Sequence, residues 1–347
     1  MSNSRISRRD FLKLCGLGLT SLAFRPYFQF GEELDNPNLA RITTTSVSVH
    51  SQPNDESRIL YQRFRDDLLS IYEEVISPDG PGYNPKWYRV WGGYVHSAHV
   101  LRTTPRLNPV LSSLTGSRQL GEITVPFTQS MRKVGKGWEP VYRLYDHSCH
   151  WIVGIETGPD GQIWYALKDE LLEVDYYIPA EHMRPIPYSE WSPISTDVDR
   201  FKKRIDVSLT MQTATAFEND KQVFSAKISS GIPQLYAIPG KIPTATPTGQ
   251  FRVQSKMASK HMGDGNLTAD PEAYEIPGVP WAAFFEPVTG VAFHGVYWHD
   301  NYGTPMSHGC VNMRPKDALW IFRWTTPDAP PDKEEQVGWG TLVNVFY

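Results

Sequence analysis

Two stretches near the C-terminus decide how this chain is interpreted: residues 293–299 read Phe-His-Gly-Val-Tyr-Trp-His, and residues 307–312 read Ser-His-Gly-Cys-Val-Asn. A nucleophilic cysteine needs a base that takes its proton and backbone donors for the oxyanion of the intermediate. A lone cysteine beside glycine and valine is usually a small buried apolar residue. Three histidines, a serine and an asparagine around one cysteine are an unusual way to fill a core, so the pattern favours acyl transfer through Cys310.

These residues carry a resemblance to a known family. His294 followed by the 307–312 motif resembles the signature of the L,D-transpeptidases, whose catalytic domain is called YkuD-type. Thr-Pro-Thr-Gly-Gln-Phe-Arg-Val at 246–253 is similar to an early turn and strand of that family, and Trp281, the Tyr-Trp-His run and residues 340–345 match as well. The resemblance implies a β-rich catalytic domain at 201–347 with one or few short helices.

The resemblance also implies a role for each central residue. Cys310 attacks a peptide carbonyl to form a thioester, and His294 is the base, oriented by the backbone carbonyl of Gly295. His308 lies two residues before the cysteine, so in an extended segment it projects to the same side and is the second candidate for the base. The backbone amides of Gly309 and Cys310 are the expected oxyanion donors.

Five further residues are expected to hold the loop or border the substrate. Ser307 and Asn312 hold the nucleophile loop, Tyr297 and Trp298 form a cleft wall, and His299 contacts the carboxylate of the acceptor. The segment 256–274 is expected to be a mobile flap without a catalytic role.

The implied substrate is the stem peptide of peptidoglycan, cut before a terminal D-alanine. An amine acceptor gives a cross-link and water gives a trimmed tripeptide, so L,D-carboxypeptidation is an alternative to transpeptidation. A non-catalytic wall-binding protein is a further alternative. Carbapenem-type inhibitors are expected to acylate Cys310. NlpC-type cysteine peptidases place the cysteine before the histidine, the reverse of the order here.

The N-terminus predicts export. Residues 7–13 read Ser-Arg-Arg-Asp-Phe-Leu-Lys, and an apolar run at 14–24 follows that is short for a membrane span. We interpret residues 1–30 as a twin-arginine signal, recognised by the twin-arginine export machinery. Because no clean cleavage site follows, the segment is also a candidate membrane anchor. The expected location is the cell wall or periplasmic space.

An internal repeat occupies the middle of the chain. Trp-Tyr at 87–88 is followed by Tyr-Val at 94–95 and His-Val at 99–100, and Trp-Tyr at 164–165 is followed by Tyr-Ile at 177–178 and His-Met at 182–183. The pattern predicts two small SH3-like barrels, module 1 (residues 38–105) and module 2 (residues 117–187). By analogy with exported wall enzymes we expect glycan or peptide binding by these modules, although Trp87, Trp91 and Trp164 are interpreted as barrel core.

The rest of the pattern gives boundaries and elements. Three prolines within residues 184–193 predict a domain boundary followed by a semi-rigid linker, assigned to residues 188–200. Alternating residues at 205–209 and 211–213 predict paired strands, Asn-Asp at 219–220 a hairpin turn, and 221–228 the returning strand. Proline at the first position and apolar residues at helical spacing predict a helix at 315–324. The whole fold is therefore expected to be mainly β.

Composition limits the partners and cofactors. The chain of 347 residues has a net charge of -4, and outside residues 1–30 it is more acidic still, so no nucleic-acid footprint is present. Beyond the signal only Cys149 and Cys310 remain, which predicts free thiols rather than a disulfide framework. Residues 147–150 read His-Ser-Cys-His, which is poor metal-ligand geometry, so we expect no metal and no organic cofactor. A monomer is expected.

Overall fold

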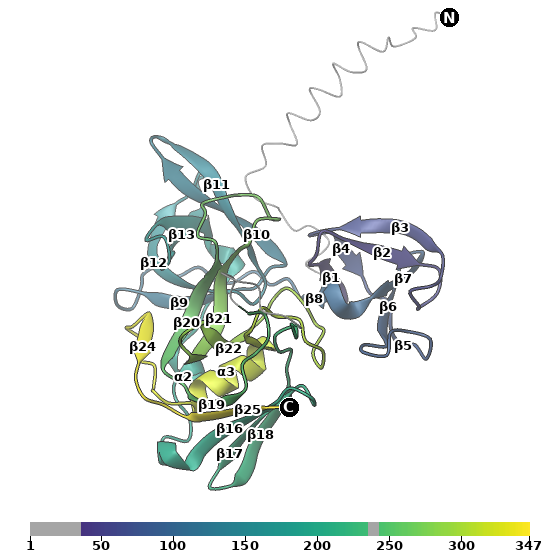
Figure 1. Cartoon of the computed structure of the whole chain (residues 1–347). Coiled ribbons are helices and arrows are strands. Elements are labelled where there is room, and N and C mark those ends of the chain that lie inside the picture. The colour runs from purple at the N-terminus through teal and green to yellow at the C-terminus, as the bar shows by residue number, and fades with distance from the viewer. Residues whose placement is uncertain (1–35, 235–242) are drawn as a thin grey trace, which may run out of the picture.

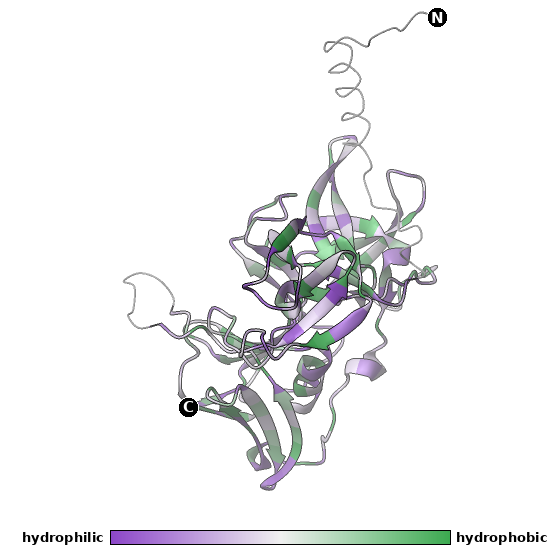
Figure 2. Ribbon diagram, turned by 90° about the vertical axis from the view of Figure 1, so that its right-hand side faces the viewer, coloured by the Kyte–Doolittle hydropathy of each residue, from purple (hydrophilic) through white to green (hydrophobic). Residues whose placement is uncertain are grey.

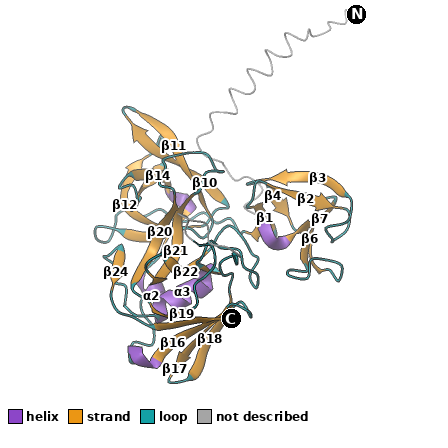
Figure 3. Ribbon diagram, viewed as in Figure 1, coloured by secondary structure: helices purple, strands orange, loops and turns teal. Residues whose placement is uncertain are grey.

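The computed structural model describes residues 36–234 and 243–347, so the predicted signal at 1–30 lies outside the described residues. The described chain is mainly β, as predicted, with only two short α-helices in it (Figure 3). Within these ranges no helix is both long enough and apolar enough to cross a bilayer.

Module 1 forms two small sheets, with strand orders β4-β1-β8 and β3-β2-β7-β6-β5 (Figure 1). Its core is buried between them and includes Ile42, Val49, Tyr88 and Val95. The elements are β1 (Leu39–Ile42), β2 (Ser46–His50), β3 (Ile59–Phe64), β4 (Leu68–Ser70), β5 (Glu73–Ile76), β6 (Lys86–Val90), β7 (Gly93–His96), the 3-10 helix η2 (Ser97–His99) and β8 (Val100–Arg102).

Module 2 forms one seven-stranded sheet, with the order β11-β10-β14-β13-β12-β9-β15. Long antiparallel pairs dominate it, and bulges interrupt both the β10–β11 and the β12–β13 register. The elements are β9 (Gln119–Ile123), β10 (Phe127–Val134), β11 (Gly137–Tyr145), β12 (Cys149–Thr157), β13 (Ile163–Lys168), β14 (Asp175–Pro179), the 3-10 helix η3 (Ala180–His182) and β15 (Met183–Pro185).

The sequence repeat has a structural counterpart. Each module ends with a strand, a three-residue 3-10 helix and a short closing strand, β7–η2–β8 in module 1 and β14–η3–β15 in module 2. Trp87 and Trp164 are both fully buried, as expected of barrel core, but Trp91 is 75% exposed. The expectation for Trp91 was wrong because Gly92 with φ +77° turns the chain beside it, at the end of β6.

The catalytic domain packs two five-stranded sheets around a helix. One sheet has the order β18-β17-β16-β25-β19 and the other β23-β22-β21-β20-β24, and α3 lies between them in Figure 1. Buried residues alternate with partly exposed ones along β16 and β17, which places one face of each strand in the core. Figure 2, coloured by hydropathy, shows hydrophobic and hydrophilic stretches interspersed along the ribbon. The elements of the first sheet are β16 (Lys203–Ser208), β17 (Thr213–Glu218), β18 (Lys221–Lys227), β19 (Gly249–Arg252) and β25 (Leu342–Phe346), preceded by α2 (Tyr188–Trp191) and the 3-10 helix η4 (Arg200–Lys202). Those of the second are β20 (Ser255–Gly263), β21 (Glu275–Glu286), β22 (Val291–Gly295), β23 (Val311–Met313) and β24 (Glu335–Val337), with α3 (Pro315–Trp324).

Two predictions need correction here. Met211 and Gln212 were expected to begin a strand, but they form the turn before β17, where Gln212 has a φ of +48°. The segment 256–274 was expected to be a flap, but its first half is β20, paired with both β21 and β24. Pairing with β21 runs along residues 255–263 and pairing with β24 along residues 255–257, so only residues 264–274 form a loop.

The predicted helix is confirmed as α3, and two buried lysines stabilise its end. Lys203 Nζ donates to the Trp324 carbonyl (3.1 Å) and Lys256 Nζ to the Thr325 carbonyl (2.7 Å). Carbonyls of a last helical turn have no partner within the helix and carry negative partial charge, so cations are favourable there. Both lysines are 1–2% exposed, and burial lowers the pKa of Lys256 to about 7.

The Pro-rich stretch after module 2 is not a simple linker. Its residue Trp191 is 3% exposed and belongs to a hydrophobic core that contains residues of both module 2 and the catalytic domain. Rings of Trp151 from module 2 and of Trp281 and Phe322 from the catalytic domain lie with centroids 6.1–6.4 Å from its own. Module 2 and the catalytic domain therefore share one core.

The β20–β21 hairpin is held by both modules. His261 on β20 is buried between two carboxylates, with Nδ1 2.8 Å from Asp169 of module 2 and Nε2 2.9 Å from Glu275 on β21. These carboxylates raise the pKa of His261 against the effect of burial, which favours an imidazolium. At the loop, Glu272 accepts from Arg65 of module 1 (2.6 Å). The hairpin is thus fixed from two sides.

Truncating the shared core should be costly. We expect Trp191→Ala to lower the free energy of unfolding by about 3–5 kcal/mol, because it leaves a cavity among packed rings. The exposed Trp91→Ala is the matched control and should change the value by less than about 0.5 kcal/mol. Urea denaturation of both variants measures this; equal effects would contradict the shared core.

The buried lysine should make stability depend on pH. A depressed pKa means that the unfolded state binds more protons between pH 7 and 10, so unfolding free energy rises with pH there, by about 1.4 kcal/mol per unit from Lys256. Lys256→Met should remove this contribution. The measurement is urea denaturation of both proteins at pH 7, 8 and 9; parallel curves would show that Lys256 titrates normally.

Candidate active site

The histidine and the cysteine are brought together by a pair of parallel strands. In the β22–β23 ladder Phe293 pairs with Val311 and His294 pairs with Asn312. Cys310 directly precedes β23, so the register continued by one residue places it opposite Ala292. Alternate residues of a strand share a face, and therefore Cys310 and His294 lie on the same face of this sheet.

Cys310 is a free, half-buried thiol in the resting structure. Its Sγ lies 3.8 Å from the Gly290 carbonyl, and the backbone N–H of Ala292 donates to it. Burial raises the pKa of the thiol to about 11, more than the hydrogen bond lowers it. The resting thiol is therefore protonated at neutral pH.

His294, the residue expected to act as the base, is buried beside a backbone carbonyl. It is 2% exposed, and its Nδ1 lies 3.1 Å from the Gly295 carbonyl, which can only accept, so Nδ1 carries the proton. Nε2 is then the proton acceptor. Burial lowers the pKa of His294 to about 4, so the ring is neutral at physiological pH and able to take a proton. The ring also lies near Trp298, with centroids 5.9 Å apart.

Ser307 and Thr246 fix the nucleophile loop. Ser307 Oγ donates to the Cys310 carbonyl (2.5 Å) and accepts from Gly309 N–H (3.2 Å). Thr246 Oγ1 donates to the Gly309 carbonyl (2.7 Å) and accepts from Gly231 N–H (2.7 Å). A side chain at Gly231 would collide with this arrangement, since its Cβ would lie 2.9 Å from Gly309 Cα and 2.1 Å from a carbonyl.

Two expectations about this loop change with the geometry. Gly309 has φ +121°, so the loop turns there and is not extended, which removes the basis for placing His308 beside the thiol. His308 is exposed and its ring faces Tyr274 from the hairpin loop, with centroids 6.3 Å apart. Gly309 N–H already donates to Ser307, so it is engaged in the resting state and is not a free oxyanion donor.

The other expected substrate residues support the site from behind. His299 is 1% exposed; Asn301 N–H donates to its Nδ1 (3.3 Å), and its Nε2 lies 3.0 Å from the Asn312 amide. A half-turn of that amide places its otherwise unpartnered oxygen against Nε2–H. Burial lowers the pKa of His299 to about 3, so the ring stays neutral. The prediction that His299 contacts an acceptor carboxylate was wrong, because neither ring nitrogen is free.

Tyr297 and Trp298 form a wall that module 1 holds in place. The Tyr297 hydroxyl donates to the Pro277 carbonyl (2.7 Å) and is buried, so it does not face substrate as expected. The carbonyls of Tyr297 and Trp298 accept from Arg41 (3.0 Å) and Thr43 (2.7 Å) of module 1. Trp298 is partly exposed and packs edge-on against Tyr297, with centroids 5.1 Å apart.

Sequence reasoning missed the residues that hold the loop from outside the motif. Thr246 lay in a motif that the sequence analysis quoted without giving this side chain a role. Ser229, which exchanges backbone hydrogen bonds with Asn312 (both 2.9 Å) and donates through Oγ to the Asn301 carbonyl (2.8 Å), gave no signal at all. Both lie more than 60 residues before the cysteine.

Residues 147–150, which were not expected to bind a metal, have other partners in the structure. His150 has one ring nitrogen 2.9 Å from Ser148 Oγ and the other 2.7 Å from the Tyr176 hydroxyl, and Cys149 is fully buried. Within residues 36–234 and 243–347 no group of three or more His, Cys, Asp or Glu side chains is arranged to hold a metal ion.

The resting thiol should react slowly at neutral pH. With a pKa near 11, about one thiol in ten thousand is ionised at pH 7, so the alkylation rate of Cys310 by iodoacetamide should rise about tenfold per pH unit up to pH 10. Mass spectrometry of the modified peptide measures this. The buried Cys149 is the internal control and should stay unmodified. A rate that levels off below pH 7 would instead reveal a thiolate–imidazolium pair at rest.

Comparison with known proteins gives a family for the C-terminal part. Residues 202–343 match the family model of the L,D-transpeptidase catalytic domain, YkuD, whose members are L,D-transpeptidases. No curated protein matches the chain.

Several solved structures are similar to parts of the chain. A cysteine-to-serine mutant of an Enterococcus faecium L,D-transpeptidase is 26% identical, with a TM-score of 0.31, over 43% of this chain and 50% of that one. The catalytic domain of the E. faecium enzyme is 25% identical, with a TM-score of 0.30, over 42% of this chain and 96% of that one. An L,D-transpeptidase from Mycobacterium smegmatis is 15% identical, with a TM-score of 0.32, over 76% of this chain and 90% of that one. The match thus spans about half the length of the first of these proteins.

Proposed function

We propose that this protein is a cysteine L,D-transpeptidase that acts on peptidoglycan stem peptides. The observation that carries the proposal is the hydrogen bond between His294 Nδ1 and the Gly295 carbonyl, which leaves Nε2 as a proton acceptor on the face that also holds Cys310. The match of residues 202–343 to the L,D-transpeptidase catalytic domain supports the same reaction class.

The reaction begins with an uncharged Cys310 thiol and an uncharged His294 imidazole. Because the pKa of Cys310 is raised and that of His294 is lowered, a resting ion pair is disfavoured, and the thiol proton moves to Nε2 as sulfur attacks the donor carbonyl. We expect the backbone N–H of Cys310 to stabilise the resulting oxyanion, joined by Gly309 N–H if Ser307 releases its bond.

Acyl transfer then proceeds in two halves. The tetrahedral intermediate collapses, the carbon–nitrogen bond breaks, and the terminal D-alanine leaves as an amine that takes the proton from His294. A thioester with Cys310 remains. An amine of a second stem peptide attacks it, gives its proton to His294 and forms the new amide, and the thiolate recovers that proton. With water as acceptor the same steps release a tripeptide.

The setting is part of the proposal. We infer that the predicted twin-arginine signal exports the folded protein to the wall compartment and that modules 1 and 2 position the catalytic domain on the polymer. A positioning role is supported by the hydrogen bonds of Arg41 and Thr43 to the main-chain carbonyls of Tyr297 and Trp298, close to His294.

A product assay tests the reaction. Signal-free protein should release D-alanine from a purified disaccharide tetrapeptide and form a cross-linked dimer, detected by mass spectrometry. Cys310→Ala should abolish both products, and His294→Asn should lower kcat/KM by about 10³-fold or more, because the proton acceptor is lost.

Controls separate the alternatives. Cys149→Ser tests the second thiol and should keep activity. His308→Ala should reduce activity by less than about tenfold, since the His308 ring faces Tyr274 and is not assigned a part in the proton transfer between Cys310 and His294. Tripeptide without dimer would indicate carboxypeptidase action. Wall binding without any thiol-dependent product would overturn the proposal in favour of a non-catalytic binding protein.

A further inference from the structure

A cavity of about 450 Å³ lies where module 1, module 2 and the catalytic domain meet. Neither Cys310 nor His294 lines it. Apolar side chains line part of it, with Ile186 from the end of module 2 and Trp281 and Leu319 from the catalytic domain. We call it the junction cavity. Its size suits a sugar unit or a short peptide, and all three parts of the protein contribute to it.

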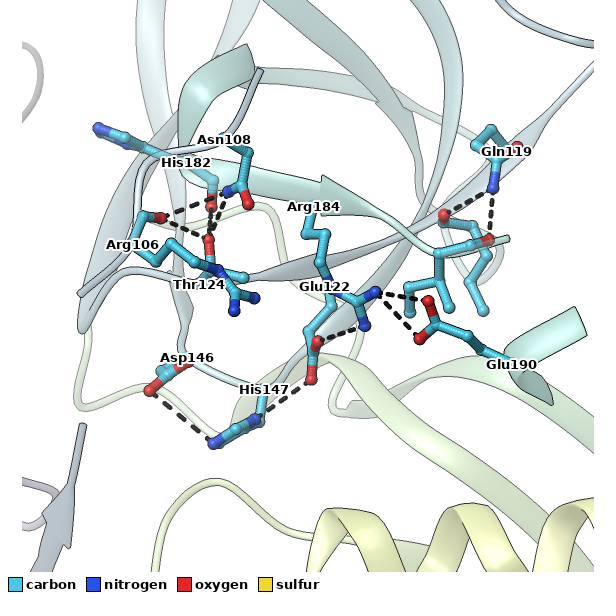
Figure 4. A network of polar contacts seen from close by, with 12 residues as sticks. Arg106, Asn108, Gln119, Glu122, Thr124, Asp146, His147, His182, Arg184 and Glu190 are labelled. Carbon is cyan, nitrogen blue, oxygen red and sulfur yellow. Dashed lines mark hydrogen bonds and ion pairs between the residues drawn. The ribbon is translucent and has the colours of Figure 1, made fainter. Parts of the chain in front are cut away.

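The module 2 side of the junction cavity carries charges that neutralise one another (Figure 4). Glu122 lies 3.2 Å from both Arg184 and His147, and Arg184 also reaches Glu190 (2.9 Å). Asp146 lies 3.9 Å from His147 and is the largest cause that raises the pKa of this histidine to about 9. This side is a closed network of paired charges and offers no free charge to a ligand.

Two other cations that line the junction cavity make no ion pair within the described residues. Arg102, at the end of module 1, donates to the amide oxygen of Asn38 (3.2 Å) and makes no ion pair with any described residue. Lys316, in the first turn of α3, makes neither a hydrogen bond nor an ion pair in the described chain, and its side chain is exposed. Arg314 and Lys86 both pair with Asp300, at 3.9 and 3.0 Å. An anionic group would therefore find two unpaired cations, Arg102 and Lys316.

One acidic side chain on the rim is also unpaired. Glu74 on β5 lines the junction cavity, and it makes no ion pair within the part of the chain that the structure describes. A ligand with an ammonium group in addition to a carboxylate would therefore be complementary to the rim, and its aliphatic part would lie on Ile186 and Leu319.

We propose that the junction cavity is a second binding site, separate from the thiol site, for a peptide that carries both a free carboxylate and a free ammonium. Its carboxylate pairs with Arg102 and Lys316, and its ammonium with Glu74. The proposal rests on the proposed function in one respect, because only that function identifies the peptide as an uncut or trimmed stem peptide of the wall polymer.

The position of the cavity connects it to the active site. Tyr297 and His299 line the cavity, while Trp298 between them lies against His294, with ring centroids 5.9 Å apart. One three-residue segment therefore has the cavity on one side and the proton acceptor on the other. A bound peptide holds this segment and, through it, the three parts of the chain in one arrangement.

Calorimetric titration of the whole Cys310→Ala protein with a disaccharide tripeptide tests the proposal without turnover. We expect the double variant Arg102→Ala/Lys316→Ala to bind about tenfold or more weakly, because two charge-assisted contacts are lost. Lys333→Ala, an exposed lysine away from the cavity, is the matched control and should bind like the parent. Equal affinity of the double variant and the parent would overturn the site.

Ligand variants test the chemistry. A tripeptide amidated at its carboxylates and one acetylated at its free amine should each bind several-fold more weakly, and the disaccharide alone should not bind. Binding of the disaccharide as tightly as the whole ligand would overturn peptide recognition. Thermal unfolding of the double variant, expected to match the parent within a few degrees, excludes a folding defect as the cause.

The product assay distinguishes this proposal from the proposed function. If the parent with its thiol intact forms no product while binding still depends on Arg102 and Lys316, the function fails and the junction cavity stands. If product forms but binding is insensitive to both side chains, the function stands and the cavity proposal is wrong.

Discussion

The shared core around Trp191 is the constraint on which the rest of the structure depends. A four-residue helix after module 2 inserts this ring between Trp151 of module 2 and Trp281 and Phe322 of the catalytic domain. Gly278 lets the two parts approach closely, since a Cβ there would lie 2.2 Å from the His150 ring. With the position of module 2 fixed in this way, Asp169 reaches His261 and the hairpin beside the thiol is held in place.

Burial also sets the chemical state of the active site. The same apolar surroundings that hold β22 and β23 push the pKa of the thiol up and that of the histidine down, so both groups rest uncharged. A neutral pair is less reactive toward oxidants and alkylating agents than a preformed thiolate. In the proposed reaction, charge develops only when a carbonyl is present to accept the sulfur and backbone donors can stabilise its oxygen.

The sequence predicted what depends on neighbouring residues. The helix at 315–324 and the Asn-Asp turn at 219–220 follow from local patterns, and the structure has both where they were expected. It did not predict the burial of Trp191 in a Pro-rich stretch, because the rings around it come from distant parts of the chain. It also missed the occupied ring nitrogens of His299, because Asn301 and Asn312 reach that ring only through the folded loop. Strand β20 was mistaken for a mobile flap, because it owes its order to pairing with β21 and β24 rather than to its own pattern.

The contacts of module 1 with residues 297 and 298, close to His294, determine which substitutions these two positions tolerate. Arg41 and Thr43 bind main-chain carbonyls of residues 297 and 298, not their side chains. A carbonyl is present whatever the amino acid, so this attachment survives substitution of either aromatic residue as long as the backbone keeps its path. The side chain at position 298 is therefore free to change during evolution while the docking of module 1 stays the same.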